Sequence, residues 1–184
     1  MTSEVETSDQ ALRISEIFLS LQGEAATAGY PTVFVRLTGC PLRCSYCDTS
    51  YAFTGGSTIS VTEIIEQVAD YGVMHVCITG GEPLAQKGTL GLLKQLCDRG
   101  FSVSLETSGA LDISQVDERV QRVMDLKTPC SGEAARNRYE NIDYLNQNDQ
   151  VKIVICDRDD YDWAKALNER YRINERCELL FSPC

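Results

Sequence analysis

The chain has 184 residues, and its 27 acidic and 17 basic side chains give a formal net charge of −10. This length suits one globular domain, and a composition of 43% hydrophobic and 24% charged residues is typical of a folded chain. The sequence has no apolar run near the roughly 18–20 residues that cross a bilayer, and its acidic start is unlike a signal or transit peptide. The acidity also disfavours a nucleic-acid partner, which needs a basic face. We therefore expect a cytoplasmic domain that binds neither membrane nor nucleic acid.

Short runs of β-branched residues alternate with stretches of helical spacing along the chain. These runs predict strands over residues 13–18, 32–37, 75–79, 102–106, 122–125, 150–155 and 178–181. The helical spacing predicts helices over residues 60–71, 89–98, 114–119 and 161–171. The first of these helices opens with Ser60 and Glu63 in a capping-box pattern.

The order of these elements favours an α/β fold, because strands that alternate with helices form βαβ units and a largely parallel sheet. Residues 129–149 are polar without clear periodicity and predict a long loop, which in a compact domain is usually functional or disordered. We expect residues 1–11 to form a disordered tail and residues 12–184 to form a single domain.

The nine cysteines fall into two groups. Six are spread along the chain, and in apolar runs a buried cysteine behaves as a small hydrophobic residue; they are Cys77, Cys97, Cys130, Cys156, Cys177 and Cys184. The other three, Cys40, Cys44 and Cys47, lie within eight residues in the spacing C-x3-C-x2-C. An odd count without a secretion signal argues against a disulfide framework. The triplet therefore indicates a metal centre.

The ligand count decides between the kinds of metal centre. A structural zinc site needs four ligands, usually in two separated pairs, and the only histidine, His75, falls in an apolar strand pattern. A 4Fe–4S cluster can instead be held by three cysteines, which leaves one iron open to a small molecule. The triplet therefore favours an iron–sulfur cluster with an open iron.

Two motifs together resemble the radical S-adenosylmethionine enzymes. The cysteine triplet, with Tyr46 before its third cysteine, resembles their cluster loop, whose open iron binds the methionine part of S-adenosylmethionine. Reductive cleavage then gives a 5′-deoxyadenosyl radical that abstracts hydrogen from substrate. The segment TGGEP at residues 79–83 resembles the motif that contacts the amino group of this cosubstrate, and paired glycines let a backbone approach a ligand closely. A simple strand-to-helix turn would explain the glycines but not their occurrence downstream of a cysteine triplet.

Three further segments narrow the resemblance. They read FLSLQGE at residues 18–24, VFVRLTGC at residues 33–40 and DT at residues 48–49. With segments 105–109 and 125–129 they resemble the 7-carboxy-7-deazaguanine synthase family of the queuosine (7-deazaguanine) pathway. The resemblance runs from about residue 12 to the end of the sequence.

This resemblance implies both a fold and a reaction. The fold would be a partial, open (β/α)6-type barrel with about six parallel strands and an abbreviated core, its site at the carboxyl ends of the strands. The reaction would convert 6-carboxy-5,6,7,8-tetrahydropterin to 7-carboxy-7-deazaguanine with loss of ammonia. The implied cofactors are a 4Fe–4S cluster, S-adenosylmethionine and Mg²⁺. The implied partners are the pterin and an external one-electron reductant such as flavodoxin or ferredoxin, and we expect a homodimer.

The resemblance also assigns residues. The metal ligands would be Cys40, Cys44 and Cys47 for the cluster and Thr49 for magnesium. The substrate would contact Leu21, Gln22, Gly23, Arg36 and Thr79. The cosubstrate would contact Tyr46, Cys47, Asp48, Gly80, Gly81, Glu82, Ser108 and Lys127. Arg36 has a planar guanidinium that suits the substrate carboxylate. The resemblance assigns no catalytic side chain, because the cosubstrate supplies the radical.

Two other functions stay open. A glycyl-radical activating enzyme shares the triplet and the cosubstrate motif but needs a surface for a large protein partner. An iron–sulfur electron carrier shares the triplet but has no use for Gly80 and Gly81. The resemblance also implies a further segment beyond Cys184, with a glutamine-rich strand and a histidine–lysine–tryptophan element. Either the chain is truncated at Cys184 or this member of the family lacks the closing segment.

Overall fold

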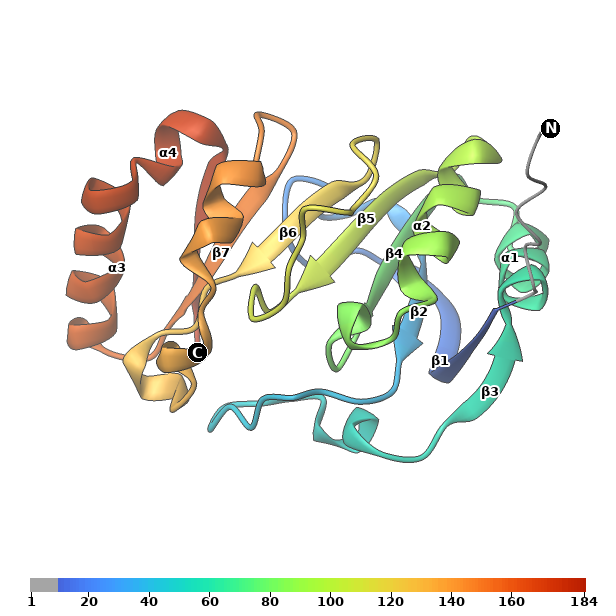
Figure 1. Ribbon diagram of the computed structural model, residues 1–184, viewed down its shortest axis with the longest axis horizontal. Coiled ribbons are helices and arrows are strands. Elements are labelled where there is room, and N and C mark those ends of the chain that lie inside the picture. The colour runs from blue at the N-terminus through green and yellow to red at the C-terminus, as the bar shows by residue number, and fades with distance from the viewer. Residues whose placement is uncertain (1–9) are drawn as a thin grey trace, which may run out of the picture.

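The computed structural model describes residues 10–184 (Figure 1). Its strands are β1 (Ala11–Leu21), β2 (Pro31–Leu37), β3 (Ser57–Ser60), β4 (His75–Gly80), β5 (Ser102–Thr107), β6 (Gln121–Asp125), β7 (Gln150–Ile155) and β8 (Glu178–Pro183). Its α-helices are α1 (Val61–Asp70), α2 (Thr89–Asp98), α3 (Arg158–Tyr171) and α4 (Ile173–Arg176). Its short 3-10 helices are η1 (Ser50–Phe53), η2 (Pro83–Ala85), η3 (Pro129–Ser131), η4 (Ala134–Arg136) and η5 (Tyr139–Tyr144).

All of these strands belong to one sheet, in the order β3-β1-β2-β4-β5-β6-β7-β8. The strands from β2 through β4, β5, β6 and β7 to β8 pair in parallel, whereas β1 pairs antiparallel with both β2 and β3. The expected six parallel strands of an open partial barrel are therefore confirmed. The sequence did not predict β3, which extends the sheet beyond β1.

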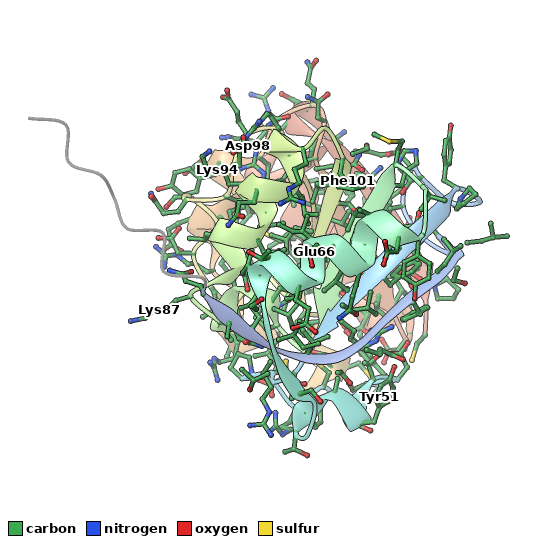
Figure 2. The ribbon with its side chains drawn as sticks, turned by 90° about the vertical axis from the view of Figure 1, so that its right-hand side faces the viewer. Tyr51, Glu66, Lys87, Lys94, Asp98 and Phe101 are labelled. Carbon is green, nitrogen blue, oxygen red and sulfur yellow. The ribbon has the colours of Figure 1, made fainter. Side chains whose placement is uncertain are left out.

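The helices cover one face of the sheet with apolar side chains at helical spacing. In α1 the buried residues are Val61, Ile64, Ile65 and Val68, which recur at intervals of three and four. The helix begins where predicted, because the Ser60 hydroxyl accepts a hydrogen bond from the Glu63 backbone N–H at 3.1 Å. Figure 2 shows α1 and α2 side by side on this flank, with polar residues such as Glu66 and Lys94 on their outward faces.

Two local predictions are corrected by the structure. Residues 114–119 form turns rather than a helix, because Asp112 accepts from the Ser114 N–H at 2.9 Å and Asp117 from the Arg119 N–H at 3.0 Å. Such local side-chain bonds compete with the helical ladder. The predicted tail lies outside the described residues except for Gln10 and Ala11, and Ala11 already pairs with Ser60 as the first residue of β1.

The loops that follow the parallel strands gather at one edge of the sheet. In Figure 1 the light-blue segment after β2 runs along the lower edge, below the arrowheads of the central strands. The Ser45 backbone N–H in this segment donates to the Ser131 carbonyl at 3.0 Å, and the Ser45 hydroxyl donates to the Cys130 carbonyl at 2.7 Å. The segment after β2 is therefore fastened to the segment after β6. Across residues 10–184, no helix combines the length and apolar composition that a bilayer crossing requires.

Candidate active site

A cavity of about 600 Å³ opens at the carboxyl ends of the parallel strands. Alternation along each strand directs side chains into it: in β2, Val35 and Leu37 join the hydrophobic core while Phe34 and Arg36 line the cavity. In β7, Lys152 lines the cavity between core residues in the same way. A cavity of this size suits a small-molecule ligand.

The structure brings nearly all of the predicted site residues together. Those that line the cavity are Leu21, Gln22, Gly23, Arg36, Cys40, Cys44, Tyr46, Cys47, Asp48, Thr49, Thr79, Gly80, Gly81, Ser108 and Lys127. They come from β1, β2, β4, the segment after β2 and the ends of β5 and β6. Glu82 is the exception, because it is fully buried and does not line the cavity.

The buried Glu82 carboxylate binds the protein itself. It accepts hydrogen bonds from the Ser108 N–H at 2.7 Å, the Ser108 hydroxyl at 2.5 Å, the Thr107 hydroxyl at 3.0 Å and the Leu84 N–H at 3.0 Å. The structure thus gives Glu82 a role in positioning its neighbours, and its contact with a cosubstrate stays a prediction. Glu82 holds Ser108, which does face the cavity, at the end of the neighbouring strand.

The three cysteines of the triplet are free, partly buried thiols on the segment after β2. Burial raises the pKa of the Cys40 thiol, and the nearby Glu82 carboxylate adds to the rise. Burial likewise raises the pKa of Cys44, while the Lys127 ammonium opposes that rise. Metal ligation needs thiolates, so the positive charge of Lys127 favours the ligating form of Cys44.

Backbone packing requires glycine at positions 80 and 81, in addition to any contact that these residues make with a ligand. A Cβ on Gly81 would lie 2.2 Å from the Gly39 carbonyl oxygen, and a Cβ on Gly80 would lie 2.2 Å from that of Leu37. The Gly81 N–H donates to the Leu37 carbonyl at 3.1 Å. The end of β4 therefore packs backbone to backbone against the start of the cysteine loop, a contact that only glycine permits.

Four charged side chains that line the cavity were not among the predicted site residues: Glu24, Glu106, Asp125 and Lys152. Glu106 in β5 accepts from the Thr79 hydroxyl at 2.7 Å, and Asp125 in β6 pairs with Lys127 at 3.0 Å and with Lys152 at 3.8 Å. Burial lowers the pKa of Lys127, but Asp125 together with Cys44 and Cys40 outweighs burial, so the net shift is upward. Glu106, Asp125 and Lys152 could have been found in the sequence as charged residues within predicted strands, because alternate residues of a strand face opposite sides of the sheet.

Asp125 also has an atom that the protein leaves unpaired. Its Oδ1 is buried, and among the described residues it has no hydrogen-bond partner. Buried acceptors are nearly always paired, so an unpaired acceptor on a cavity-lining residue indicates a donor supplied by a ligand.

Arg36 lies among aromatic rings. Its Nε donates to the Glu16 carboxylate at 2.7 Å, and its Cζ lies 5.8 Å from the Phe18 ring centroid and 5.9 Å from that of Tyr51. The Tyr51 hydroxyl donates to the same Glu16 oxygen at 2.8 Å. Glu16 thus holds one edge of the guanidinium and orients its remaining nitrogens.

The other predicted contacts are partly engaged within the protein. The Thr49 hydroxyl donates to the Asp48 carboxylate at 2.8 Å. The Gln22 N–H donates to the Tyr30 carbonyl at 2.9 Å, and the Gln22 carbonyl accepts from the Gly29 N–H at 2.7 Å. The backbone of Gln22 therefore closes the turn between β1 and β2.

Comparison with known proteins places this geometry in a family. Residues 34–132 match the radical SAM superfamily. The chain is 43% identical to the 7-carboxy-7-deazaguanine synthase of Chlorobaculum tepidum over 180 residues, which is 96% of this chain and 82% of that protein. It is 41% identical to the synthase of the same name from Koribacter versatilis over 177 residues, which is 94% of this chain and 77% of that protein.

The chain belongs to the radical SAM superfamily and, within it, to the 7-carboxy-7-deazaguanine synthase family. The fold agrees with a solved structure, the crystal structure of QueE from Escherichia coli, with a TM-score of 0.80 at 24% identity over 95% of this chain and 84% of that chain. A second similar fold is that of Streptococcus suis SuiB bound to S-adenosylmethionine, with a TM-score of 0.55 at 15% identity over 80% of this chain and 46% of that chain.

Membership of the 7-carboxy-7-deazaguanine synthase family implies a 4Fe–4S cluster and S-adenosylmethionine, and the residues present fit both groups. The triplet supplies three thiols around one cavity. Three cysteines on one short segment can hold one cluster, since each cysteine of a cluster binds a different iron. The unpaired Oδ1 of Asp125 adds an acceptor for a bound cosubstrate.

Proposed function

We propose that this chain converts 6-carboxy-5,6,7,8-tetrahydropterin to 7-carboxy-7-deazaguanine with loss of ammonia, a step of queuosine biosynthesis. The observation that carries the proposal is that one cavity of about 600 Å³ joins the cysteine triplet to a partly buried arginine. Family membership supplies the reaction class, in which a small molecule is the substrate and an external reductant the electron source. We propose that this reductant is a flavodoxin or ferredoxin and that the chain forms a homodimer.

The protein's own residues would bind and orient the two small molecules. When bound, the cluster and S-adenosylmethionine supply the 5′-deoxyadenosyl radical that abstracts hydrogen from substrate. Cys40, Cys44 and Cys47 would hold the cluster, and Ser108 and Lys127 would contact the cosubstrate beside it. The guanidinium of Arg36 would bind the substrate carboxylate through the nitrogens that Glu16 leaves available.

Magnesium is a separate part of the proposal. Thr49 and Asp48 line the cavity next to the triplet and offer a hydroxyl and a carboxylate. Mg²⁺ prefers oxygen ligands and keeps several waters, so one protein hydroxyl together with substrate oxygens suits it. We propose that Thr49 binds the ion directly and that Asp48, which accepts the Thr49 hydrogen bond, fixes the orientation of the hydroxyl.

An anaerobic assay tests the reaction. The chain reconstituted with iron and sulfide, S-adenosylmethionine and a reductant should turn the carboxypterin into a product of the mass of 7-carboxy-7-deazaguanine. Cleavage of S-adenosylmethionine without conversion of the pterin would contradict the proposal. The activating-enzyme alternative would be supported if the chain instead placed a radical on a glycine of a partner protein.

Single replacements distinguish the cysteines that bind the cluster from the cysteines that do not. Cys40→Ala, Cys44→Ala and Cys47→Ala should each abolish cleavage of S-adenosylmethionine, because each removes one of three cluster ligands. Cys77→Ser and Cys97→Ser are the matched controls and should keep the full iron content. Iron analysis and product mass measure both effects, and a control cysteine required for iron binding would overturn the three-ligand assignment.

A further inference from the structure

A second group of thiols lies beside the site described above. The sulfur atoms of Cys130 and Cys156 and a carboxylate oxygen of Asp160 all lie within 4.8 Å of one another. Burial raises the pKa of the Cys156 thiol, and the neighbouring thiols of Cys184 and Cys130 add to the rise. Two thiols and one carboxylate therefore meet at one point, and the thiol of Cys184 lies near that of Cys156, although these residues are far apart in the sequence.

The parallel sheet causes this convergence. Cys130 lies in η3 after β6, Cys156 directly follows β7, and Cys184 directly follows β8. Neighbouring parallel strands end at the same edge of a sheet, so residues just past their ends are neighbours in space. The Cys184 N–H donates to the Ile155 carbonyl at 3.0 Å, which holds the ends of β7 and β8 together. Figure 1 shows the C-terminus beside the yellow and orange segment that follows β6.

The carboxylate of this group is already oriented by the protein. Asp160 is 1% exposed, and it accepts from the Cys130 N–H at 3.1 Å, the Thr128 hydroxyl at 3.0 Å and the Cys156 N–H at 3.2 Å. A carboxylate has about four lone-pair sites, so three hydrogen bonds leave one for a metal ion. Hydrogen-bonded carboxylates of this kind are typical of metal sites, because their partners fix the ligand geometry.

We propose that Cys130, Cys156, Cys184 and Asp160 bind a zinc ion. This site is distinct from the cluster triplet and rests on different ligands. In a tetrahedral site with Zn–S distances of about 2.3 Å, ligand atoms lie about 3.8 Å apart. The ligand atoms of Cys130, Cys156 and Asp160 are at most 4.8 Å apart, so small side-chain rotations would bring them to zinc geometry. A rotation of the Cys184 side chain would bring its thiol in as the fourth ligand. Three thiolates select a thiophilic ion such as Zn²⁺ over Mg²⁺ or Ca²⁺, which prefer oxygen.

The position of the zinc site suggests what it does. The Cys130 carbonyl accepts from the Ser45 hydroxyl in the cluster loop, and Cys184 lines the active-site cavity. An ion bound to the ends of β6, β7 and β8 would hold Cys130 in place, and the cluster loop is hydrogen-bonded to Cys130 through Ser45. Because all four ligands are protein groups, the site would be structural rather than catalytic.

Elemental analysis of the loaded chain tests the proposal. Wild-type chain is reconstituted anaerobically under thiol reductant with iron, sulfide and equimolar zinc and then freed of loose metal on a chelating resin. Wild type should retain a single zinc ion per chain in addition to its iron. Cys156→Ser should lose the zinc and keep the iron, whereas the matched control Cys97→Ser, in α2, should keep both metals. Equal zinc in wild type and Cys156→Ser, or no zinc in wild type, would overturn the proposal.

A second measurement isolates the site from the cluster loop. The variant Cys40→Ala/Cys44→Ala/Cys47→Ala is titrated with Co²⁺, which substitutes for zinc and gives sulfur-to-metal charge-transfer and tetrahedral d–d bands. These bands should appear at one equivalent and weaken in the same background with Cys184→Ser, which removes one thiolate. Absence of thiolate–cobalt bands in a variant that folds would contradict the zinc site. Because pterin conversion and iron content are measured separately, failure of the zinc site is distinguishable from failure of the proposed reaction.

Discussion

Arg36 depends on its neighbours for the chemistry assigned to it. Its side chain is only 17% exposed, and the Glu16 carboxylate and the rings of Phe18 and Tyr51 surround it. A substrate carboxylate that enters this partly desolvated part of the cavity needs a positively charged partner. An oriented guanidinium binds the carboxylate through two parallel N–H donors. Lysine supplies a positive charge but not this paired geometry.

Replacement of Arg36 should therefore weaken substrate binding. Charge-assisted hydrogen bonds contribute roughly 1.5–3 kcal/mol each to binding. Arg36→Ala should therefore raise the apparent KM for the carboxypterin at least tenfold. Arg36→Lys should have a smaller effect, and cluster absorbance and slow substrate-free cleavage of S-adenosylmethionine should persist in both variants. Steady-state kinetics and visible absorbance measure these effects. If Arg36→Ala binds the carboxypterin as tightly as wild type, the carboxylate role is wrong.

Thr49 is tested by removing and then restoring its hydroxyl. Thr49→Ala should keep its iron and its cosubstrate binding but lose the rate enhancement that added Mg²⁺ gives, because the ion loses its protein ligand. Thr49→Ser keeps the hydroxyl and should respond to Mg²⁺ as wild type does. Turnover against magnesium concentration is the measurement, and a wild type indifferent to magnesium would dismiss the assignment.

At the scale of elements, the end of β4 approaches the cluster loop too closely for any residue but glycine at position 81. Gly81→Ala would place a Cβ 2.2 Å from the Gly39 carbonyl oxygen and 2.9 Å from the Cβ of Cys40. Both neighbours belong to the loop that holds the cluster ligands, and neither is the flexible end of a long side chain. We therefore expect the loop to shift and the iron content to fall in this variant.

The matched control lies in a helix. Gly91 is in α2, where a Cβ would meet only Gln10 Oε1 at an ordinary 3.6 Å. Gly91→Ala should keep full iron and raise the unfolding free energy by about 0.5–1 kcal/mol, because alanine favours a helix over glycine. Equal iron content in the Gly81 and Gly91 variants would show that the close approach at Gly81 does not matter for the loop.

At the scale of the whole molecule, a buried ion pair joins β6 to the segment before β7. The Arg122 guanidinium bonds to Asp149 at 2.8 and 3.1 Å, and the Asp149 side chain is fully buried. Asp149 also accepts from the Asn146 N–H at 2.9 Å. The pair therefore fixes the return of the chain into β7, whose far end carries Cys156.

Breaking this pair should destabilise the fold. Asp149→Asn leaves the Arg122 charge buried without its partner and should lower the unfolding free energy by about 3–5 kcal/mol. Asp98→Asn is the control, since Asp98 pairs with Lys94 and Arg119 on the surface and its removal should change stability little. Denaturant unfolding of the chain measures both. A similar midpoint for the two variants would contradict the role of the buried pair.

The sequence alone determined the elements whose cause is local. Apolar runs identified the parallel strands, Ser60 and Glu63 located the start of α1, and the spacing of Cys40, Cys44 and Cys47 identified a cluster loop. Each of these signals acts over a few residues, so no knowledge of the partner segments was needed. Where a short-range signal competed with another, as at residues 114–119, the side-chain hydrogen bonds of Asp112 and Asp117 prevailed over helical periodicity.

Only the tertiary structure decided which distant residues meet. The buried role of Glu82 depends on Ser108 at the end of another strand. The thiols of Cys130 and Cys156 meet, and that of Cys184 lies near them, because β6, β7 and β8 are neighbours in the sheet. In the sequence these three cysteines looked like small core residues, since each lies alone in its own segment. Strand order and register set such contacts, and they follow from packing of the whole sheet rather than from any local pattern.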